Sequence, residues 1–292
     1  MTVDESFAAL GSTVRLIGSE LAVQRARADV LDYHERFSRF LPSSELSALN
    51  ADPRRTVPAS PLLRSAVRAG LWAAAFSGGL VDPCLLDALE AAGYARSYED
   101  GDQIHRPCGP FRAARPHRAA RWRHVRVDHE AGTITRPPGV RLDLGGTGKG
   151  HVADLVARHF AGDWVVDAGG DIRVGGARTI HVAHPLDQHP AAQLDVRDCA
   201  VATSSLVSRA WQRADGRAGH HLLDPSTGLP VRTGLLSATA IAPTTLEAET
   251  VAKVALLRGG AGARAALAGR GGVLVREDGT VETIGLSREV AA

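Results

Sequence analysis

The chain has 292 residues, of which 44% are hydrophobic and 23% are charged, as expected for a folded protein that buries a sizeable core. With 34 basic and 32 acidic residues the formal charge is only +2, which excludes bulk-charge binding of nucleic acid or membranes as the leading function. The cysteines Cys84, Cys108 and Cys199 form no CxxC pair, which argues against a disulfide framework and a cysteine zinc site.

The N-terminal residues predict a cytoplasmic protein. Met1 to Glu5 include acidic side chains and lack the basic and apolar regions of a secretory signal. The longest apolar stretch, residues 71–80, is interrupted by Ser77 and two glycines and is too short to span a membrane. We therefore expect no membrane segment.

The first 92 residues predict one interrupted strand followed by helices. Residues 7–17 are typical of a strand that breaks at Gly11, and Pro42 ends the first helix. Ser44, with Glu45 behind it, predicts a new helix start. Helices are expected over residues 19–40, 61–76 and 83–92.

Residues 95–126 differ from the rest because arginines are interleaved with prolines. One interpretation is a basic stripe for nucleic acid, with Trp122 as a stacking platform. The other is a proline-broken surface connection, which the balanced charge of the chain favours. We expect a single domain over residues 1–292 with an Arg/Pro-rich loop or insertion at about residues 95–124.

The remaining chain is rich in predicted strands. Helices and strands come in blocks rather than in strict alternation, which indicates an α+β fold. Strands are expected at residues 125–128, 133–136, 140–144, 164–167, 179–184, 193–201, 272–275 and 281–284, and helices at residues 150–160, 247–257 and 261–268.

Lysine occurs only at Lys149 and Lys253, although the chain has 34 basic residues. A codon bias toward arginine explains the scarcity of lysine but not why these two remain. Because lysine is a compact point charge and arginine a broad planar fork, we interpret both positions as requiring a small ammonium group. Chance retention is the alternative.

Two glycine-rich turns follow predicted strands. Residues 142–151 can present backbone N–H groups and Lys149 to an anion, although their spacing fits neither a Walker A loop nor GxGxxG. Residues 164–172 end in a double glycine and Asp171, which permits close approach of a ligand. Ordinary turns are the alternative for both.

The histidines supply a candidate base. His221 precedes the turn at residues 224–228, and a histidine beside a rigid turn can act as a general base because its ordinary pKa lies near neutral pH. A metal cluster of His181, His184 and His189 fits no known ligand spacing and is not favoured.

Residues 244–253 read as a helix start. Thr244 and Glu247 have capping-box spacing, and Glu249 and Lys253 lie four residues apart on one helix face. The ordinary interpretation of the second pair is a surface ion pair, but Lys253 is one of the two lysines.

Taken together and in this order, these segments resemble the FAD:protein FMN transferases, the ApbE family. The resemblance covers most of the chain. It rests on Leu10-Gly11-Ser12, Phe37-Ser38-Arg39-Phe40, Ser44-Glu45-Leu46-Ser47, Val81-Asp82-Pro83-Cys84, residues 143–151, Gly169-Gly170-Asp171-Ile172, Thr203-Ser204, residues 221–228 and the helix at Glu249.

The resemblance implies an ApbE-like (T-fold-related) architecture of mixed sheets with packed helices. It further implies that FAD is the substrate, that Mg²⁺ assists, and that FMN is transferred to a threonine hydroxyl of an acceptor flavoprotein with release of AMP. His221 falls at the position of the base, and Gly146, Glu249 and Lys253 fall at metal-site positions. The implied FAD contacts are Leu10, Phe40, Ala92, Gly93, Tyr94, Asp143, Lys149, Asp171 and Leu223.

Three residues depart from the family pattern. Glu249 stands where the family's metal helix has an aspartate, although a glutamate can still bind Mg²⁺. Lys253 stands where the family has a threonine metal ligand, and a protonated lysine has no lone pair for a cation. We therefore expect Lys253 to occupy part of the metal position and to weaken or replace the need for Mg²⁺. Cys84 replaces a usual threonine. Two alternatives remain on the same fold: a non-catalytic FAD-binding protein, and an FAD pyrophosphatase that uses water as the acceptor.

Overall fold

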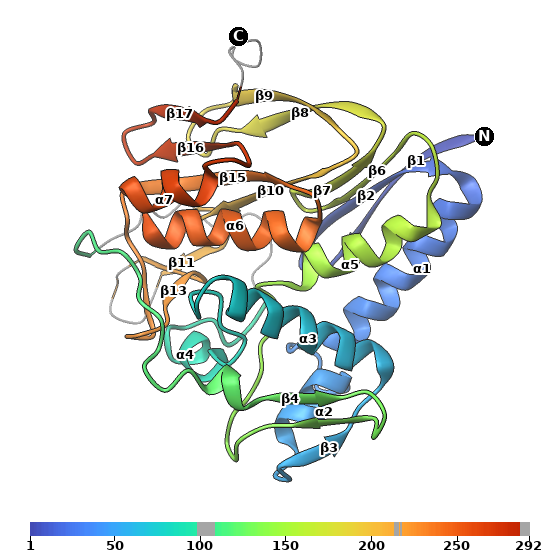
Figure 1. Ribbon diagram of the computed structural model, residues 1–292, viewed down its shortest axis with the longest axis vertical. Coiled ribbons are helices and arrows are strands. Elements are labelled where there is room, and N and C mark those ends of the chain that lie inside the picture. The colour runs from blue at the N-terminus through green and yellow to red at the C-terminus, as the bar shows by residue number, and fades with distance from the viewer. Residues whose placement is uncertain (98–108, 213–215, 217, 287–292) are drawn as a thin grey trace.

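The computed structural model describes residues 1–97, 109–212, 216 and 218–286 (Figure 1). Its centre is a large sheet in which each strand pairs with its neighbours in antiparallel fashion. The order is β1 (Thr2–Ala9), β2 (Ser12–Ser19), β6 (Trp164–Ala168), β7 (Asp171–Gly175), β10 (Ala200–Ser205), β15 (Leu235–Ala242), β16 (Gly272–Arg276) and β17 (Val281–Ile284).

Helices cover one face of this sheet and extend below it (Figure 1). They are α1 (Glu20–Phe37), α2 (Glu45–Ala51), α3 (Pro61–Phe76), α4 (Leu86–Ala91), α5 (Gly148–Val156), α6 (Thr245–Arg258) and α7 (Gly260–Leu267), with 3-10 turns at Arg121–His124 and Ala157–His159. The predicted α+β class is therefore confirmed. None of the helices in the described part of the chain is long and apolar enough to cross a membrane.

Smaller sheets complete the fold. The hairpin β8–β9 packs its valines and leucine against the other face of the large sheet. The strands are β3 (Thr56–Pro58), β5 (Thr133–Thr135) and β4 (Arg126–Asp128) in one small sheet, and the pairs β8 (Ala177–Ala183) with β9 (Pro190–Arg197), β11 (Ala210–Gln212) with β12 (Ala218–His220), and β13 (Leu223–Asp224) with β14 (Leu229–Pro230).

Helix α6 is buried on nearly every side, because it lies between β10 and β15 of the sheet and the helices α3, α5 and α7. Its buried residues include Glu249 and Lys253 as well as the apolar ones. The ordinary interpretation of these two residues as a surface pair is therefore wrong. A burial pattern that surrounds the helix leaves almost no amphipathic signal for a sequence to show.

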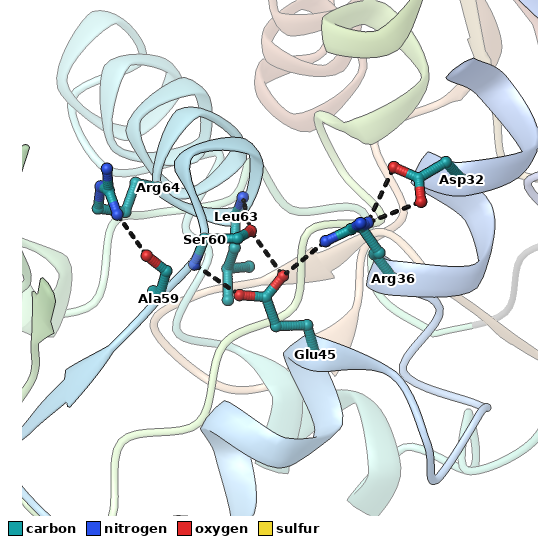
Figure 2. Close-up of polar contacts among 7 residues, drawn as sticks. All are labelled: Asp32, Arg36, Glu45, Ala59, Ser60, Leu63 and Arg64. Carbon is teal, nitrogen blue, oxygen red and sulfur yellow. Dashed lines mark hydrogen bonds and ion pairs between the residues drawn. The ribbon is translucent and has the colours of Figure 1, made fainter. Parts of the chain in front are cut away.

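Glu45 connects three helices below the sheet (Figure 2). Its carboxylate accepts hydrogen bonds from Ser60 N and Ser60 Oγ, both at 2.7 Å, at the start of α3. Arg36, near the end of α1, lies 3.8 Å from the same carboxylate and is also paired with Asp32. This junction fixes the chain on either side of residues 38–41. These residues follow α1 and line the cavity described in the next subsection.

Several elements differ from the prediction, and three of the differences are informative. Residues 140–144 form no strand, because the backbone of Leu142 pairs with the Asn50 side chain and not with a neighbouring strand. Leu142 N donates to Asn50 Oδ1, and Asn50 Nδ2 donates to Leu142 O. The single strand expected at residues 193–201 is two strands, β9 and β10, separated by Asp198 at a positive φ of 49°. Strand β15 was not expected at all.

The Arg/Pro-rich insertion is only partly described. Residues 98–108 lie outside the described residues. The rest of the segment from residue 109 to 124 is irregular apart from the 3-10 turn and one bridge between Arg112 and Arg232. That these residues are an insertion within one domain stays a prediction.

Candidate functional site

A cavity of about 360 Å³ lies where the β1–β2 turn, the end of α1, the start of α5 and the inner face of α6 meet. This volume is in the range of small-molecule sites. Its walls include Leu10, Tyr33, Arg39, Phe40, Tyr94, Asp143, Gly146, Lys149, Arg209, His221, Leu223 and Lys253.

Helices α5 and α6 hold one another through hydrogen bonds between side chains and backbone. Glu249 of α6 accepts a hydrogen bond from Gly150 N of α5 at 2.9 Å. Asp154 of α5 accepts from the backbone N–H groups of Thr245 and Leu246 at 2.8 and 2.9 Å. A side chain at Gly150 would meet Glu249 and Leu246 within 2.8 Å, so only glycine allows this approach. The interlock presents the glycine-rich turn before α5 to the cavity.

Lys253 and Glu249 form a buried ion pair at the floor of the cavity. The Lys253 Nζ to Glu249 Oε1 distance is 2.9 Å, and the two side chains are 9% and 0% exposed. Burial raises the pKa of the Glu249 carboxyl, whereas the Lys253 charge acts in the opposite direction. A buried charge of this kind is stable only when paired.

The other lysine forms a second pair on the same cavity. Lys149 Nζ lies 2.8 Å from Asp171 Oδ2 and 3.2 Å from Gly169 O. Asp171 is the first residue of β7, and Lys149 lies in the first turn of α5. The double-glycine turn and the glycine-rich turn, more than twenty residues apart in sequence, therefore meet through Lys149.

His221, which is half-buried, is one of two histidines that line the cavity; the other, His34, accepts a hydrogen bond from Leu10 N at 3.3 Å. Burial, followed by the charge of Arg209, lowers its pKa well below the ordinary value, so that it is neutral at pH 7. Among the described residues, no hydrogen-bond partner contacts its buried Nδ1 atom. A neutral imidazole with an unpartnered nitrogen can accept a proton.

Neighbouring His220 has a structural role instead. Its Nε2 atom lies 2.8 Å from Val231 O, and burial lowers its pKa to about 4. The turn that follows is held by Asp224, whose Oδ1 accepts from the backbone N–H groups of Arg115 and Ser226. These contacts fix the β13–β14 hairpin and with it the position of His221.

An arginine and three aromatic rings form another wall. The Arg39 guanidinium lies over the rings of Phe40 and Tyr94, with centroid distances of 4.2 and 4.6 Å, and Tyr94 stacks on Trp211 at 5.1 Å. Arg39 Nε lies 2.8 Å from Asp143 Oδ2. Planar, electron-rich surfaces of this kind suit a flat heteroaromatic ring.

Most of the predicted site residues come together here. Those that line the cavity are Leu10, Phe40, Tyr94, Asp143, Gly146, Lys149, His221, Leu223 and Lys253. Asp171 and Glu249 lie behind the two lysines. Ala92 and Gly93 lie behind Trp211, whose indole Nε1 donates to Ala92 O at 3.1 Å.

Sequence reasoning missed several residues of the site. Among them are Tyr33, His34, Arg39 and Arg209, which line the cavity, and Trp211, which supports Tyr94. Arg39 lies within residues 37–40, a segment that carried the family resemblance, and this position was the one sequence signal that it belongs to the site. Nothing in the sequence distinguishes Arg209 from the many exposed arginines.

The residues at the implied metal position do not fit Mg²⁺. The described part of the chain contains no group of three or more His, Cys, Asp or Glu side chains that could hold a metal ion. Glu249 directs one carboxylate oxygen to Lys253 and the other to Gly150 N. An ammonium group donates and cannot coordinate, whereas Mg²⁺ demands oxygen ligands in octahedral geometry.

Comparison with known proteins shows which family the chain resembles. The profile of the ApbE family matches residues 9–275. A protein named FAD:protein FMN transferase from Treponema pallidum (strain Nichols) is 34% identical over 141 residues, which are 41% of this chain and 39% of that protein. The chain thus aligns with less than half of the length of this curated relative.

Solved structures match over almost the whole chain. The crystal structure of the ApbE protein from Thermotoga maritima has a TM-score of 0.80 and 25% identity, and covers 98% of this chain and 97% of its own. The apo flavinyl transferase ApbE from Pseudomonas stutzeri has a TM-score of 0.74 and 19% identity, with 98% and 95% covered. At 19% identity the second likeness supports the fold alone.

Proposed function

Because the chain belongs to the ApbE family, we propose that it transfers the FMN moiety of FAD to a threonine hydroxyl of an acceptor flavoprotein and releases AMP. The observation that carries the proposal is that a neutral histidine and two ammonium groups line one cavity within the matched residues. Phosphoryl transfer requires positioning and charge stabilisation, which these groups supply.

His221 is the proposed general base. The threonine hydroxyl loses its proton to His221 as its oxygen bonds to the phosphorus of the FMN moiety. The bond between this phosphorus and the bridging oxygen breaks, and its electron pair leaves with AMP. The position of His221 on the cavity wall supports this role, and the turn held by Asp224 keeps the ring in place.

The remaining wall residues bind and orient FAD. Lys149, which lines the cavity at the start of α5, is the proposed contact for the phosphate oxygens. Leu10, Phe40, Tyr94 and Leu223 supply apolar contact area. Arg39, which contacts the rings of both Phe40 and Tyr94, belongs to the wall proposed to bind one of the two ring systems of FAD.

Mg²⁺ enters none of these steps. When bound in a phosphoryl transferase it neutralises charge on the phosphate oxygens. The donors at Gly146, Glu249 and Lys253 do not suit it, so the steps above use only this chain's residues. The acceptor flavoprotein and a cytoplasmic location both stay predictions.

The test is AMP release from FAD in the presence of a flavin-acceptor domain that carries a target threonine. We expect AMP and covalently labelled acceptor in equal amounts, measured by chromatography and in-gel flavin fluorescence. His221→Asn should reduce the rate about 100-fold or more while FAD binding persists. His159→Asn, which changes an exposed histidine paired with Asp29, is the matched control.

Two other outcomes identify the alternatives. Free FMN with an unlabelled acceptor would mean that water is the acceptor and that the protein is an FAD pyrophosphatase. Tight FAD binding without AMP would identify a non-catalytic flavin-binding protein.

A further inference from the structure

Lys253 is a buried lysine whose ammonium group reaches the cavity. Its side chain is 9% exposed and lines the cavity beside Leu257 of the same helix. Glu249 accepts one hydrogen bond from Nζ at 2.9 Å. Because an ammonium group has three donors, this bond leaves two for other acceptors.

Glu249 fixes the ammonium group and does not itself face the cavity. It is fully buried, and its second oxygen accepts from Gly150 N at the start of α5. The carboxylate is therefore shared between Lys253 and the positive end of a helix. The Lys253 charge, 2.9 Å from Oε1, repels a metal ion that approaches this carboxylate.

The surroundings of Lys253 are those of a phosphate site. Its methylene chain passes beside Gly146 of the glycine-rich turn, 3.9 Å from the place of an added Cβ. The charge of Lys253 also acts on His221, the proposed base. Lys149 lines the same cavity. The only two lysines of the chain thus face one space, together with the base.

We propose that the Lys253 ammonium group is the resident cation for the diphosphate of FAD, so that this chain transfers FMN without a divalent metal. The proposal rests on the proposed function. Lys253 donates hydrogen bonds to the phosphate oxygens as the bond to the AMP oxygen breaks and negative charge gathers there. Glu249 is the positioning residue that aims the ammonium group.

The first test needs no variant. The purified full chain is freed of metal, and AMP release and FAD affinity are measured in excess EDTA and in millimolar MgCl₂. We expect both quantities to agree within about twofold between the two conditions. Titration of MgCl₂ into the FAD complex in a calorimeter should show no saturable binding.

The second test uses Lys253→Thr, which removes the ammonium group and leaves Glu249. FAD affinity in EDTA should fall about 10- to 100-fold, the loss expected for a charge-assisted hydrogen bond. MgCl₂ should restore much of this loss, because an oxygen ligand now stands beside the carboxylate. Arg258→Gln, which removes an exposed charge from the same helix, is the control and should behave as the unchanged chain.

Three results separate the outcomes. Transfer by the unchanged chain that collapses in EDTA and returns with MgCl₂ overturns the metal-free proposal and leaves the proposed function standing. If FAD binds but no AMP is released in either condition, the proposed function is overturned. The comparison of FAD affinity in EDTA and in MgCl₂ then tests the role of Lys253 by itself. FAD affinity that Lys253→Thr leaves unchanged in EDTA overturns the proposal as well.

Discussion

Two acid–base pairs with the same helical spacing have opposite roles in this molecule. Asp32 and Arg36 on α1 approach to 2.7 Å, with side chains 49% and 44% exposed. Glu249 and Lys253 on α6 approach to 2.9 Å, with side chains 0% and 9% exposed. Distance does not distinguish them, but burial does. An exposed pair is worth little, whereas each member of a buried pair depends on the other.

The largest expected effect is on Glu249→Gln. This substitution keeps the shape of the side chain but leaves the Lys253 ammonium group buried without its counter-charge. We expect the free energy of unfolding to fall by about 3–5 kcal/mol. Urea denaturation followed by circular dichroism measures it. A loss no larger than that of an exposed pair would show that Lys253 relaxes into water and is not held in the cavity.

Gly150→Ala should have the next largest effect. The added methyl group would lie 2.7 Å from Glu249 Oε2 and 2.8 Å from Leu246 Cα, so α5 and α6 have to separate. Overpacking of this kind costs about 1–3 kcal/mol. The matched control is Gly148→Ala, where the nearest atom lies at 3.6 Å and stability should hold. Equal losses in both variants would contradict the close contact of the two helices.

A comparable loss of stability is expected when the pH is lowered, because His151 is buried. His151 bonds the Tyr33 hydroxyl through Nδ1 and Ser65 Oγ through Nε2, and burial lowers its pKa from 6.5 to about 4. The unfolded chain therefore binds a proton more readily below pH 6.5. Stability that is fully present above pH 6.5 should fall by about 1–3 kcal/mol as the pH drops to 4.

The check is the pH dependence of thermal unfolding. His151→Gln should lower the stability at pH 7 but flatten its decrease toward pH 4. Exposed His159, changed to Gln, should leave the slope as it is. An unaltered slope in the His151 variant would mean that other groups, His220 foremost, account for the acid lability.

The smallest effect is expected for Asp32→Asn. The Arg36 side chain loses an exposed partner but keeps Glu45 at 3.8 Å (Figure 2). The change in unfolding free energy should be about 0.5 kcal/mol or less and should vanish at high salt. A loss approaching that of Glu249→Gln would remove the contrast between the two pairs.

Elements with strong end signals could be predicted from the sequence. Helix α3 has its predicted bounds because Pro61 starts it and the Ser60 side chain accepts from Leu63 N. Strand β15 could not be predicted in this way. Almost all of its residues are buried and several are alanines, so it lacks the alternation of apolar and polar residues that marks a half-exposed strand. Residues 140–144 have the sequence pattern of a strand, but the Asn50 side chain is hydrogen-bonded to the backbone of Leu142. No local sequence pattern reveals this long-range contact.

The site was predictable where residue type was unusual. Lys149 and Lys253 stood out in a chain of arginines, and both line the cavity. Arg39 did not stand out, although its side chain is more buried than either lysine and pairs with Asp143. The place of Arg39 in the wall depends on its contact with the Tyr94 ring, which lies in a loop far from Arg39 in the sequence. Local spacing cannot report a contact made by tertiary packing.

The most direct test of the account is a crystal structure of the full chain with FAD, grown in EDTA. The account predicts diphosphate oxygens about 3 Å from the ammonium groups of Lys149 and Lys253, with His221 beside the phosphorus of the FMN moiety. A diphosphate bound away from Lys253, with this lysine still directed only at Glu249, would contradict it.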